Sequence, residues 1–274
     1  MISQYSPDPV AQQKDSPLAN QLGLALSGGG ARGIAHLGVL AALEELRLPV
    51  ARLAGVSSGA IAGVFYAAGF SPHEILRLLM ATNVFRLTRP AFSRFGLLRL
   101  DAVEQLLAKH LGAKIAFEDL RLPLTLVATD LMAGESVYFS TGPLLLPLLA
   151  SSAVPILYRP VEYQGRQLVD GGLLNNLPVE PLLRHENVRV VGVHCNPINP
   201  EARIPNFRRL VERTLHLAIN ANTSARKSKC HLLLEPPELR HYRPLGYKRG
   251  PELFEIGYRY TMNQATALRA LVAG

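Results

Sequence analysis

Residues 21–33 read QLGLALSGGGARG, an apolar run that leads straight into a glycine-rich loop. Leu22 to Leu26 has the length and composition of a short buried strand. Ala31 to Leu46, which follows the loop, is apolar on most sides and predicts a helix packed against a sheet. A strand, a glycine loop and a helix in this order are typical of α/β folds, and the start of such a helix favours an anion.

The rest of the chain continues to alternate between strands and helices. Further strands are expected at 50–54, 122–130, 134–140, 187–195 and 231–236, and 161–172 resembles a hairpin. Helices are expected at 58–68, from Ser71 onward, at 101–110, 143–151 and 207–221, and from about Glu252 to the end. No internal repeat or linker divides the sequence. It therefore predicts an α/β domain with a largely parallel sheet over residues 21–274, after a flexible arm at 1–20.

The composition of the 274 residues limits the class of protein. Hydrophobic residues make up 48% of the chain, which is enough to build a sizeable core. The formal net charge of +8 favours contact with something anionic, such as a phospholipid surface or a nucleic acid, and the charge is scattered rather than gathered in blocks. The two cysteines, Cys195 and Cys230, form neither a disulfide framework nor a C-x-x-C motif, so no metal is expected.

The N-terminus has no apolar core of the kind that a signal peptide needs, and no apolar run approaches the roughly 18 residues that cross a bilayer. We therefore expect a cytoplasmic protein or one that lies on a membrane surface. Segment 83–100, NVFRLTRPAFSRFGLLRL, interleaves phenylalanine with arginine without a clean period. It is either a plain surface connection or a mobile cover over a site that meets an anionic bilayer.

The spacing of Gly28, Gly30 and Gly33 matches G-x-G-x-x-G, which cradles a pyrophosphate in dinucleotide-binding proteins. Those proteins also need an acid at the end of the second strand, about 20 residues further on, and here LPVARLAG ends without a carboxylate. A phosphate-binding loop of the NTPase type is excluded because no G-K-[ST] follows. The glycine loop is better suited to an oxyanion, for which its bare N–H groups are hydrogen-bond donors.

Gly55-Val56-Ser57-Ser58-Gly59 follows the second strand and opens the next helix. This G-x-S-x-G pattern between a strand and a helix predicts a nucleophile elbow with Ser57 as the nucleophile. The serine would lie on a strained turn, and Gly55 and Gly59 are needed because a side chain at either position would collide with the crossing backbone. The plainer interpretation of the same pattern is a tight turn with an idle serine.

A nucleophilic serine needs a base, and the sequence offers histidines and carboxylates. A histidine triad would use His216, His231 or His241, none of which has a convincing loop signature after a strand. Asp170, in LVDGGLLNNLP, and Asp130, in LVATDL, each stand at a strand end. The two glycines after Asp170 predict an exposed carboxylate that the backbone fixes in place, although the same position suits an aspartate that only caps a turn.

In this order, SGGGARG, GVSSG and DGG resemble the patatin-like phospholipases, acyl hydrolases that use a Ser–Asp dyad without histidine. FEDLRLPLTLVATDLMAGE and SSAVPILYRPV are similar to the bacterial and neuropathy-target-esterase-like branch of that family. The likeness runs from Leu22 to the final helix. It implies the family fold, a three-layer sandwich in which helices wrap a central, largely parallel sheet.

The resemblance also implies a role for each motif. Ser57 matches the nucleophile and Asp170 the dyad aspartate. Gly55 and Gly59 match the glycines of the nucleophile elbow. The oxyanion and substrate-binding loop would comprise Gly28, Gly29, Gly30, Arg32 and Gly33. No cofactor or metal is implied.

The expected function is hydrolysis of carboxylic esters in phospholipids, lysophospholipids or related lipids through an acyl-serine intermediate. The expected partners are a lipid substrate and an anionic membrane surface, with no nucleic acid. Three alternatives stay open. They are an acyltransferase that uses the same acyl-serine, an α/β-hydrolase-type esterase with a histidine triad, and a lipid- or nucleic-acid-binding domain with a decayed site.

Overall fold

The computed structural model describes residues 20–81, 89–90, 98–99, 101–244 and 246–273. The strands are β1 (Gln21–Leu26), β2 (Val50–Gly55), β3 (Arg89–Pro90), β4 (Leu98–Arg99), β5 (Leu124–Asp130), β6 (Glu135–Phe139), β7 (Val161–Tyr163), β8 (Arg166–Asp170), β9 (Val188–Val193) and β10 (Leu232–Leu234). The α-helices are α1 (Ala35–Glu45), α2 (Ser58–Ala67), α3 (Pro72–Ala81), α5 (Asp101–Leu111), α6 (Leu145–Ser151), α7 (Glu180–Leu183), α8 (Phe207–Lys227), α9 (Gly250–Met262) and α10 (Ala265–Ala273). The 3-10 turns are η1 (Gly30–Ile34), η2 (Phe117–Asp119), η3 (Gly171–Leu173), η4 (Pro237–His241) and η5 (Tyr247–Arg249).

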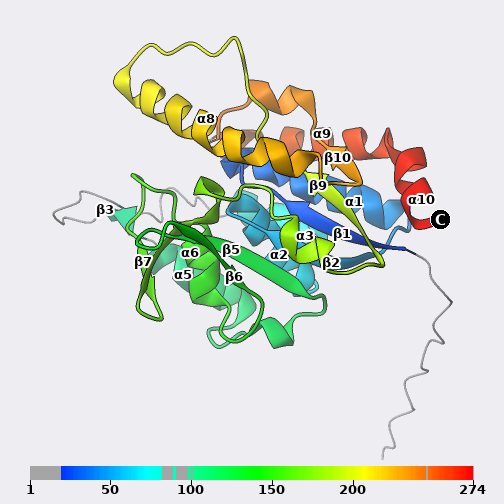
Figure 1. Ribbon diagram of the computed structural model, residues 1–274, viewed down its shortest axis with the longest axis horizontal. Helices are drawn as coiled ribbons and strands as arrows, with labels where there is room; N and C mark the ends of the chain where they lie inside the picture. Colours follow the sequence, from blue (N-terminus) through cyan, green and yellow to red (C-terminus); the bar gives the residue numbers. More distant parts are fainter. Residues whose placement is uncertain (1–19, 82–88, 91–97, 100, 245, 274) are drawn as a thin grey trace, which may run out of the picture.

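Within these residues, an eight-stranded mixed sheet forms the centre of the fold (Figure 1). β10, β9, β1, β2 and β5 lie side by side and run parallel. β6 and β8 are antiparallel to β5, and β7 is antiparallel to β8. The parallel majority confirms the expected α/β class with a largely parallel sheet.

Helices cover both faces of the sheet because the strands send alternate side chains into two cores. On β1, Leu22, Leu24 and Leu26 belong to the larger core, which also receives the apolar faces of α1, α2 and α9. Ala25 of β1 and Ala54 of β2 face a smaller core on the other side, which α7 and the turn before it close. The result is the three-layer arrangement that the family resemblance implied.

The pairing of β5 determines where its neighbours end. Leu126 pairs both with Gly55, the last residue of β2, and with β6, so β2 and β6 lie on opposite edges of β5. Ala128 pairs both with β6 and with Asp170, the last residue of β8. Because a strand has only two hydrogen-bonding edges and β6 occupies one of them, β2 and β8 share the other. Strand β2 runs parallel to β5 and β8 runs antiparallel to it, so the carboxyl ends of β2 and β8 meet head-on.

Three helices differ from the sequence-based expectation. The helix predicted at 31–46 begins as η1 and becomes α-helical only at Ala35. The helix predicted at 207–221 continues to Lys227, because Asn222 and Arg226 near its end form hydrogen bonds with η3 and α7. The predicted final helix is two helices, which a turn at Asn263 and Gln264 separates, and this turn lets Leu268 of α10 reach the larger core.

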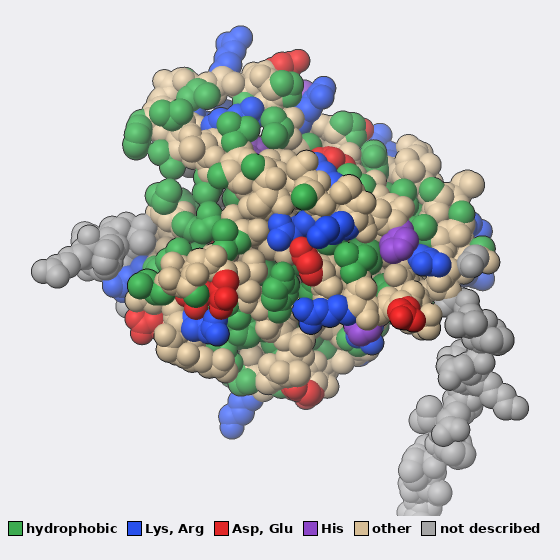
Figure 2. Space-filling view, viewed as in Figure 1, with side chains coloured by type: hydrophobic (Ala, Val, Ile, Leu, Met, Phe, Trp, Pro, Cys, Tyr) green, Lys and Arg blue, Asp and Glu red, His purple; other side chains and the backbone are tan. Residues whose placement is uncertain are grey.

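Some predictions fall outside the described residues. The arm predicted at 1–20 does so except for its last residue. Of the segment 83–100, the structure describes only β3 and β4, which form an antiparallel pair. In the part of the chain that is described, no helix is long and apolar enough to cross a membrane. Lys and Arg side chains are spread over the face seen in Figure 2, as their scatter in the sequence suggests.

Candidate active site

The turn between β2 and α2 places Ser57 in a strained conformation. Its backbone angles are φ 55° and ψ −123°, in a region that a residue with a side chain rarely adopts. The flanking glycines allow this turn: a Cβ at Gly55 would lie 2.8 Å from the carbonyl oxygen of Gly59, and a Cβ at Gly59 would lie 2.3 Å from that of Leu26. The collisions expected from the sequence are therefore present, and the turn has the geometry of a nucleophile elbow.

The meeting of β2 and β8 brings Asp170 to Ser57. Ser57 follows the end of β2 by two residues, which carries it toward the level of Ala128, the pairing partner of Asp170. After Asp170 the chain turns across β5, where a Cβ on Gly171 would lie 2.3 Å from the carbonyl oxygen of Val127. Glycine at this position allows the close crossing, and η3 follows it.

The carboxylate of Asp170 is buried, with 6% of the residue exposed, and this corrects the exposed carboxylate predicted from the sequence. The correction follows from its place at the end of a strand that abuts another strand. Burial raises the pKa of Asp170 to about 6. The Ser57 hydroxyl and the N–H of Gly172 stabilise the ionised carboxylate and so partly offset this rise in pKa. The Gly172 bond is 2.8 Å long. Such a group is mostly ionised at neutral pH and is a stronger base than an ordinary aspartate.

The end of α6 holds both residues in place. The hydroxyl oxygen of Ser151 accepts a 3.1 Å hydrogen bond from the N–H of Ser57. Two residues later, the carbonyl oxygen of Ala153 accepts a 2.9 Å bond from the N–H of Asp170. Both supporting groups come from the SSAVP stretch, whose role cannot be seen in the sequence alone because it depends on the packing of α6 against β5 and β8.

The glycine loop runs beside the elbow, with a Cβ at Gly28 calculated to lie 3.2 Å from the Cβ of Ser57. The N–H of Gly28 donates to the side-chain oxygen of Asn176 at 3.1 Å. Among the described residues, the N–H groups of Gly29 and Gly30 have no acceptor. Gly30 has φ +59°, and a side chain there would meet the backbone of Pro244. The loop therefore offers two unoccupied donors beside the serine.

Asn176 is a residue of this site that the sequence reasoning missed. It is 3% exposed, and its side-chain amide lies between two glycines. A Cβ at Gly28 would lie 2.4 Å from the amide oxygen of Asn176, and a Cβ at Gly172 would lie 2.7 Å from the same oxygen. Because its oxygen accepts the Gly28 N–H, the opposite orientation of the amide would set two donors against each other. Its nitrogen is buried and has no partner among the described residues. Asn176 thus links the glycine loop to the turn after Asp170.

A second buried group supports the glycine loop from α1. His36 donates from Nε2 to the carbonyl oxygen of Ser27 at 2.8 Å, which leaves its Nδ1 facing the sulfur of Cys195 at 3.5 Å. Burial lowers the pKa of His36 to about 4, so the ring is neutral at physiological pH. The Ser27 hydroxyl in turn accepts the N–H of Cys195 at 2.9 Å. These contacts fix the start of the loop without adding a charge.

Arg32 and Gly33 play structural parts in the loop. Arg32 is 5% exposed and donates to the carbonyl oxygen of Tyr242 at 2.8 Å and to the side-chain oxygen of Asn196 at 2.6 Å. Burial lowers the pKa of Arg32 to about 10, so its charge remains at neutral pH. A Cβ at Gly33 would lie 2.2 Å from the hydroxyl of Ser58, so glycine lets η1 approach the start of α2.

The competing bases have other partners. Asp130 caps the turn after β5 through the N–H groups of Met132 and Ala133 and pairs with Arg166 at 3.3 Å. His231 accepts the N–H of a β9 residue, and His216 of α8 lies 3.1 Å from a backbone carbonyl oxygen. In the described part of the chain, no histidine forms a hydrogen bond with Ser57, and no group of three His, Cys, Asp or Glu residues is placed to hold a metal ion.

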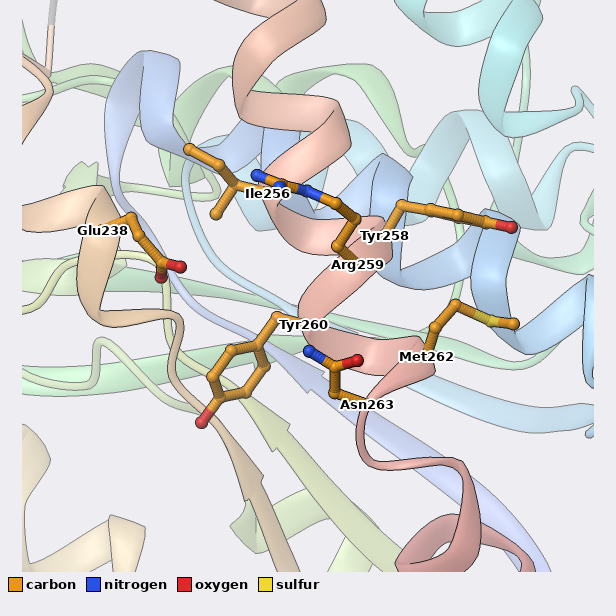
Figure 3. Close-up of a pocket in the computed structure, with 7 residues that line it drawn as sticks. All are labelled: Glu238, Ile256, Tyr258, Arg259, Tyr260, Met262 and Asn263. Carbon is orange, nitrogen blue, oxygen red and sulfur yellow. The ribbon is translucent and has the colours of Figure 1, made fainter.

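The pocket drawn in Figure 3 lies apart from this site. Its volume is about 230 Å³, and it is lined by Glu238 of η4 and by residues of α9. Tyr258 and Met262 point to one side of α9 in Figure 3 and Tyr260 to the other, so the side chains do not converge on one point. None of the lining residues belongs to the elbow, the glycine loop or the Asp170 turn.

Comparison with known proteins finds similar sequences and a similar fold. The model of the family described as patatin-like phospholipase matches residues 24–183. An uncharacterized NTE family protein of Mycobacterium tuberculosis is 39% identical over 178 residues, which are 64% of this chain and 49% of that protein. Lysophospholipase NTE1 of Scheffersomyces stipitis is 24% identical over 286 residues, covering 89% of this chain and 18% of that protein. The crystal structure of VipD from Legionella pneumophila shares the fold, with a TM-score of 0.63 at 16% identity over 90% of this chain and 67% of that chain.

Proposed function

Because the chain belongs to the patatin-like phospholipase family, we propose that it hydrolyses carboxylic esters of phospholipids, lysophospholipids or related lipids, with Ser57 as nucleophile and Asp170 as base. One observation carries the proposal. The strained turn holds Ser57 beside the buried carboxylate of Asp170, whose pKa burial raises to about 6 against the lowering effect of the Ser57 hydroxyl. A base with this pKa is ionised at neutral pH and still accepts a proton readily.

In the acylation step, the Ser57 oxygen attacks the ester carbonyl carbon while its proton passes to Asp170. The negative charge that develops on the carbonyl oxygen would be met by the N–H groups of Gly29 and Gly30, which have no acceptor among the described residues. The ten-residue helix α2 begins directly after Ser57, and its positive N-terminal end adds to this stabilisation. When the C–O bond breaks, the leaving alcohol takes the proton back from Asp170.

In the deacylation step, a water molecule attacks the acyl-Ser57 ester and gives its proton to Asp170. The tetrahedral intermediate uses the same donors, and its collapse returns the proton to the Ser57 oxygen and releases the fatty acid. Both steps therefore need Asp170 ionised at their start. Both also need Gly28 held in place by Asn176, because Gly28 directly precedes Gly29 and Gly30, whose N–H groups are the proposed donors.

The lipid substrate is inferred from relatives and from charge. A relative that covers most of this chain is named a lysophospholipase. The net charge of +8 also suits a substrate at an anionic lipid surface. The chain spans about half the length of the mycobacterial relative and less of the lysophospholipase.

Ser57→Ala provides the direct test, with Ser58→Ala as a matched control. Ser58 is the next residue, and its buried hydroxyl has no hydrogen-bond partner among the described residues, so its loss should leave both fold and turnover intact. Hydrolysis of p-nitrophenyl butyrate and covalent labelling by a fluorophosphonate should both disappear in Ser57→Ala only. Undiminished turnover in that variant would overturn the proposal, and binding of lipid by a wild type that is never labelled would favour the non-enzymatic alternative.

The same assays separate the remaining alternatives. A histidine triad predicts that joint replacement of His231 and His241 abolishes turnover, whereas the dyad predicts that turnover largely survives. An acyltransferase would pass the acyl group to an added alcohol in preference to water. A product analysis that finds the free acid as the main product with alcohol present would support hydrolysis.

A further inference from the structure

The first half of α8 presents an apolar row to solvent. Phe207, Leu210 and Leu217 are 79%, 48% and 43% exposed, and their spacing places them on one face of the helix. Ile198 and Ile204, in the loop that leads to α8, are 40% and 49% exposed. We call these five residues the α8 ridge. Apolar side chains gathered in this way on a surface mark a place of interaction.

The α8 ridge stands out from the body of the protein. Figure 1 shows the first turns of α8 and the loop before them projecting away from the sheet, on the side toward which β1 runs. Because the glycine loop follows the end of β1, this is the side of the candidate site. Figure 2 shows hydrophobic side chains gathered over the projection, with Lys and Arg side chains beside them.

The second half of α8 is anchored to the candidate site. The side-chain amide of Asn220 donates to the carbonyl oxygen of Asn196 at 2.9 Å, and the side chain of Asn196 accepts the bond from Arg32 at the end of the glycine loop. The same part of α8 also contacts the turn that follows Asp170. Asn222 donates to the carbonyl oxygen of Leu173 at 2.8 Å, in the η3 turn directly after the dyad aspartate.

The charge around the α8 ridge is mainly positive. Residues 198–217 contain four arginines and two glutamates. One of the glutamates, Glu212, is paired with Arg209 at 2.6 Å. An anionic bilayer matches such a surface, because apolar side chains enter the boundary between head groups and acyl chains while arginines meet the lipid phosphates. A second copy of the chain matches it less well, since a symmetric dimer would set this surface against itself and bring arginine close to arginine.

We propose that the α8 ridge docks the protein on an anionic phospholipid bilayer, with the candidate site facing the lipid. The inference rests on the proposed function, because a lipid hydrolase that acts on membranes must bring its nucleophile to the bilayer surface. It adds the partner and the residues that hold it. Substrate would then leave the bilayer beside α8 and reach Ser57 without crossing bulk water.

Vesicle co-sedimentation tests the proposal, with two leucines of similar exposure as a matched pair. Leu210→Ser removes part of the α8 ridge, whereas Leu183→Ser alters a 40% exposed leucine of α7. Helix α7 ends shortly before β9 begins, so Leu183 lies toward the amino end of β9, away from the carboxyl end that leads to α8. Wild type should bind phosphatidylcholine vesicles that contain phosphatidylglycerol and bind pure phosphatidylcholine more weakly. Leu210→Ser should weaken binding by about tenfold and Phe207→Ser by more, while Leu183→Ser leaves it unchanged.

Turnover of p-nitrophenyl butyrate in the same samples separates this proposal from the proposed function. This soluble ester needs no bilayer, so Leu210→Ser should hydrolyse it at the wild-type rate. Equal binding by wild type and Leu210→Ser would overturn the docking proposal even if hydrolysis is confirmed. A wild type that forms a dimer in sedimentation experiments, which Leu210→Ser converts to a monomer, would overturn it in favour of a second copy. Vesicle binding by a wild type that hydrolyses no ester would contradict the proposed function and still support the docking proposal.

Discussion

Replacing Asp170 by asparagine should stabilise the fold at neutral pH while it removes the proposed base. Burial raises the pKa of Asp170 from 3.8 to about 6, against the opposing effect of hydrogen bonds from Ser57 and Gly172. A pKa that is raised in the folded state means that the folded protein holds this proton more tightly than the unfolded chain. The free energy of unfolding therefore falls as the pH rises from 3.8 to about 6, and the loss is complete above that range.

The expected size of the effect follows from the shift in pKa. A rise of about two pKa units corresponds to about 3 kcal/mol of folding free energy. The amide of asparagine keeps an acceptor for the Gly172 N–H but brings a buried NH2 group, which costs about 1–3 kcal/mol if it finds no partner. We expect a net gain of up to about 2 kcal/mol above pH 6. This gain should shrink as the pH falls from about 6 toward 3.8, because the wild-type carboxyl group becomes protonated in that window.

Urea unfolding of wild type and variant at a series of pH values measures this difference. Asp130→Asn is the matched control with the opposite sign. The N–H groups of Ala133 and Met132 and the charge of Arg166 hold the pKa of Asp130 below its usual value, so its loss should destabilise the fold at neutral pH, and the loss should fade in acid. A stability change of Asp170→Asn that does not vary with pH, or a loss of stability at neutral pH, would refute the reasoning.

The remaining predictions concern rate and packing. The value of kcat/KM for p-nitrophenyl butyrate should fall about tenfold per pH unit below pH 6, where Asp170 takes up its proton, and level off above it; a flat profile would argue against this base. Asn176→Ala removes the acceptor of the Gly28 N–H and should lower kcat by about 10- to 100-fold with little change in KM, because a loosened glycine loop aligns its N–H donors poorly. Steady-state kinetics on the folded variant measures this effect, and an unchanged kcat would contradict it. Gly59→Ala places a Cβ 2.3 Å from a β1 carbonyl oxygen and should cost at least ~3 kcal/mol, whereas Gly134→Ala, at φ +66° in open space, should cost about 1 kcal/mol; equal melting temperatures would contradict the steric account.

The parts of the site that local sequence determines could be predicted. The collision of any side chain at Gly55 or Gly59 is a property of the turn itself, so G-x-S-x-G between a strand and a helix was enough to indicate it. The alternation of β1 between two cores likewise follows from its own residues. The layered α/β fold then follows from the order of strands and helices.

The parts that depend on strand register could not be predicted. The burial of Asp170 follows from the head-on meeting of β2 and β8 along β5, and no local pattern encodes that register. Asn176 and Ser151 form hydrogen bonds with residues more than 90 positions away in the chain, so the local sequence around them does not reveal their role. The exposure of the α8 ridge could not be predicted either, because apolar residues at helical spacing give the same sequence pattern whether they face a core or solvent.

The head-on meeting of β2 and β8 has a consequence for how the protein reaches its active form. Loop closure between segments this distant is slow, because the intervening chain must lose much of its entropy before the contact forms. A newly synthesised chain that has folded only through α2 carries its serine without the carboxylate. In a refolding experiment, recovered turnover should therefore lag behind recovered helical content, and esterase activity becomes a late reporter of completed assembly.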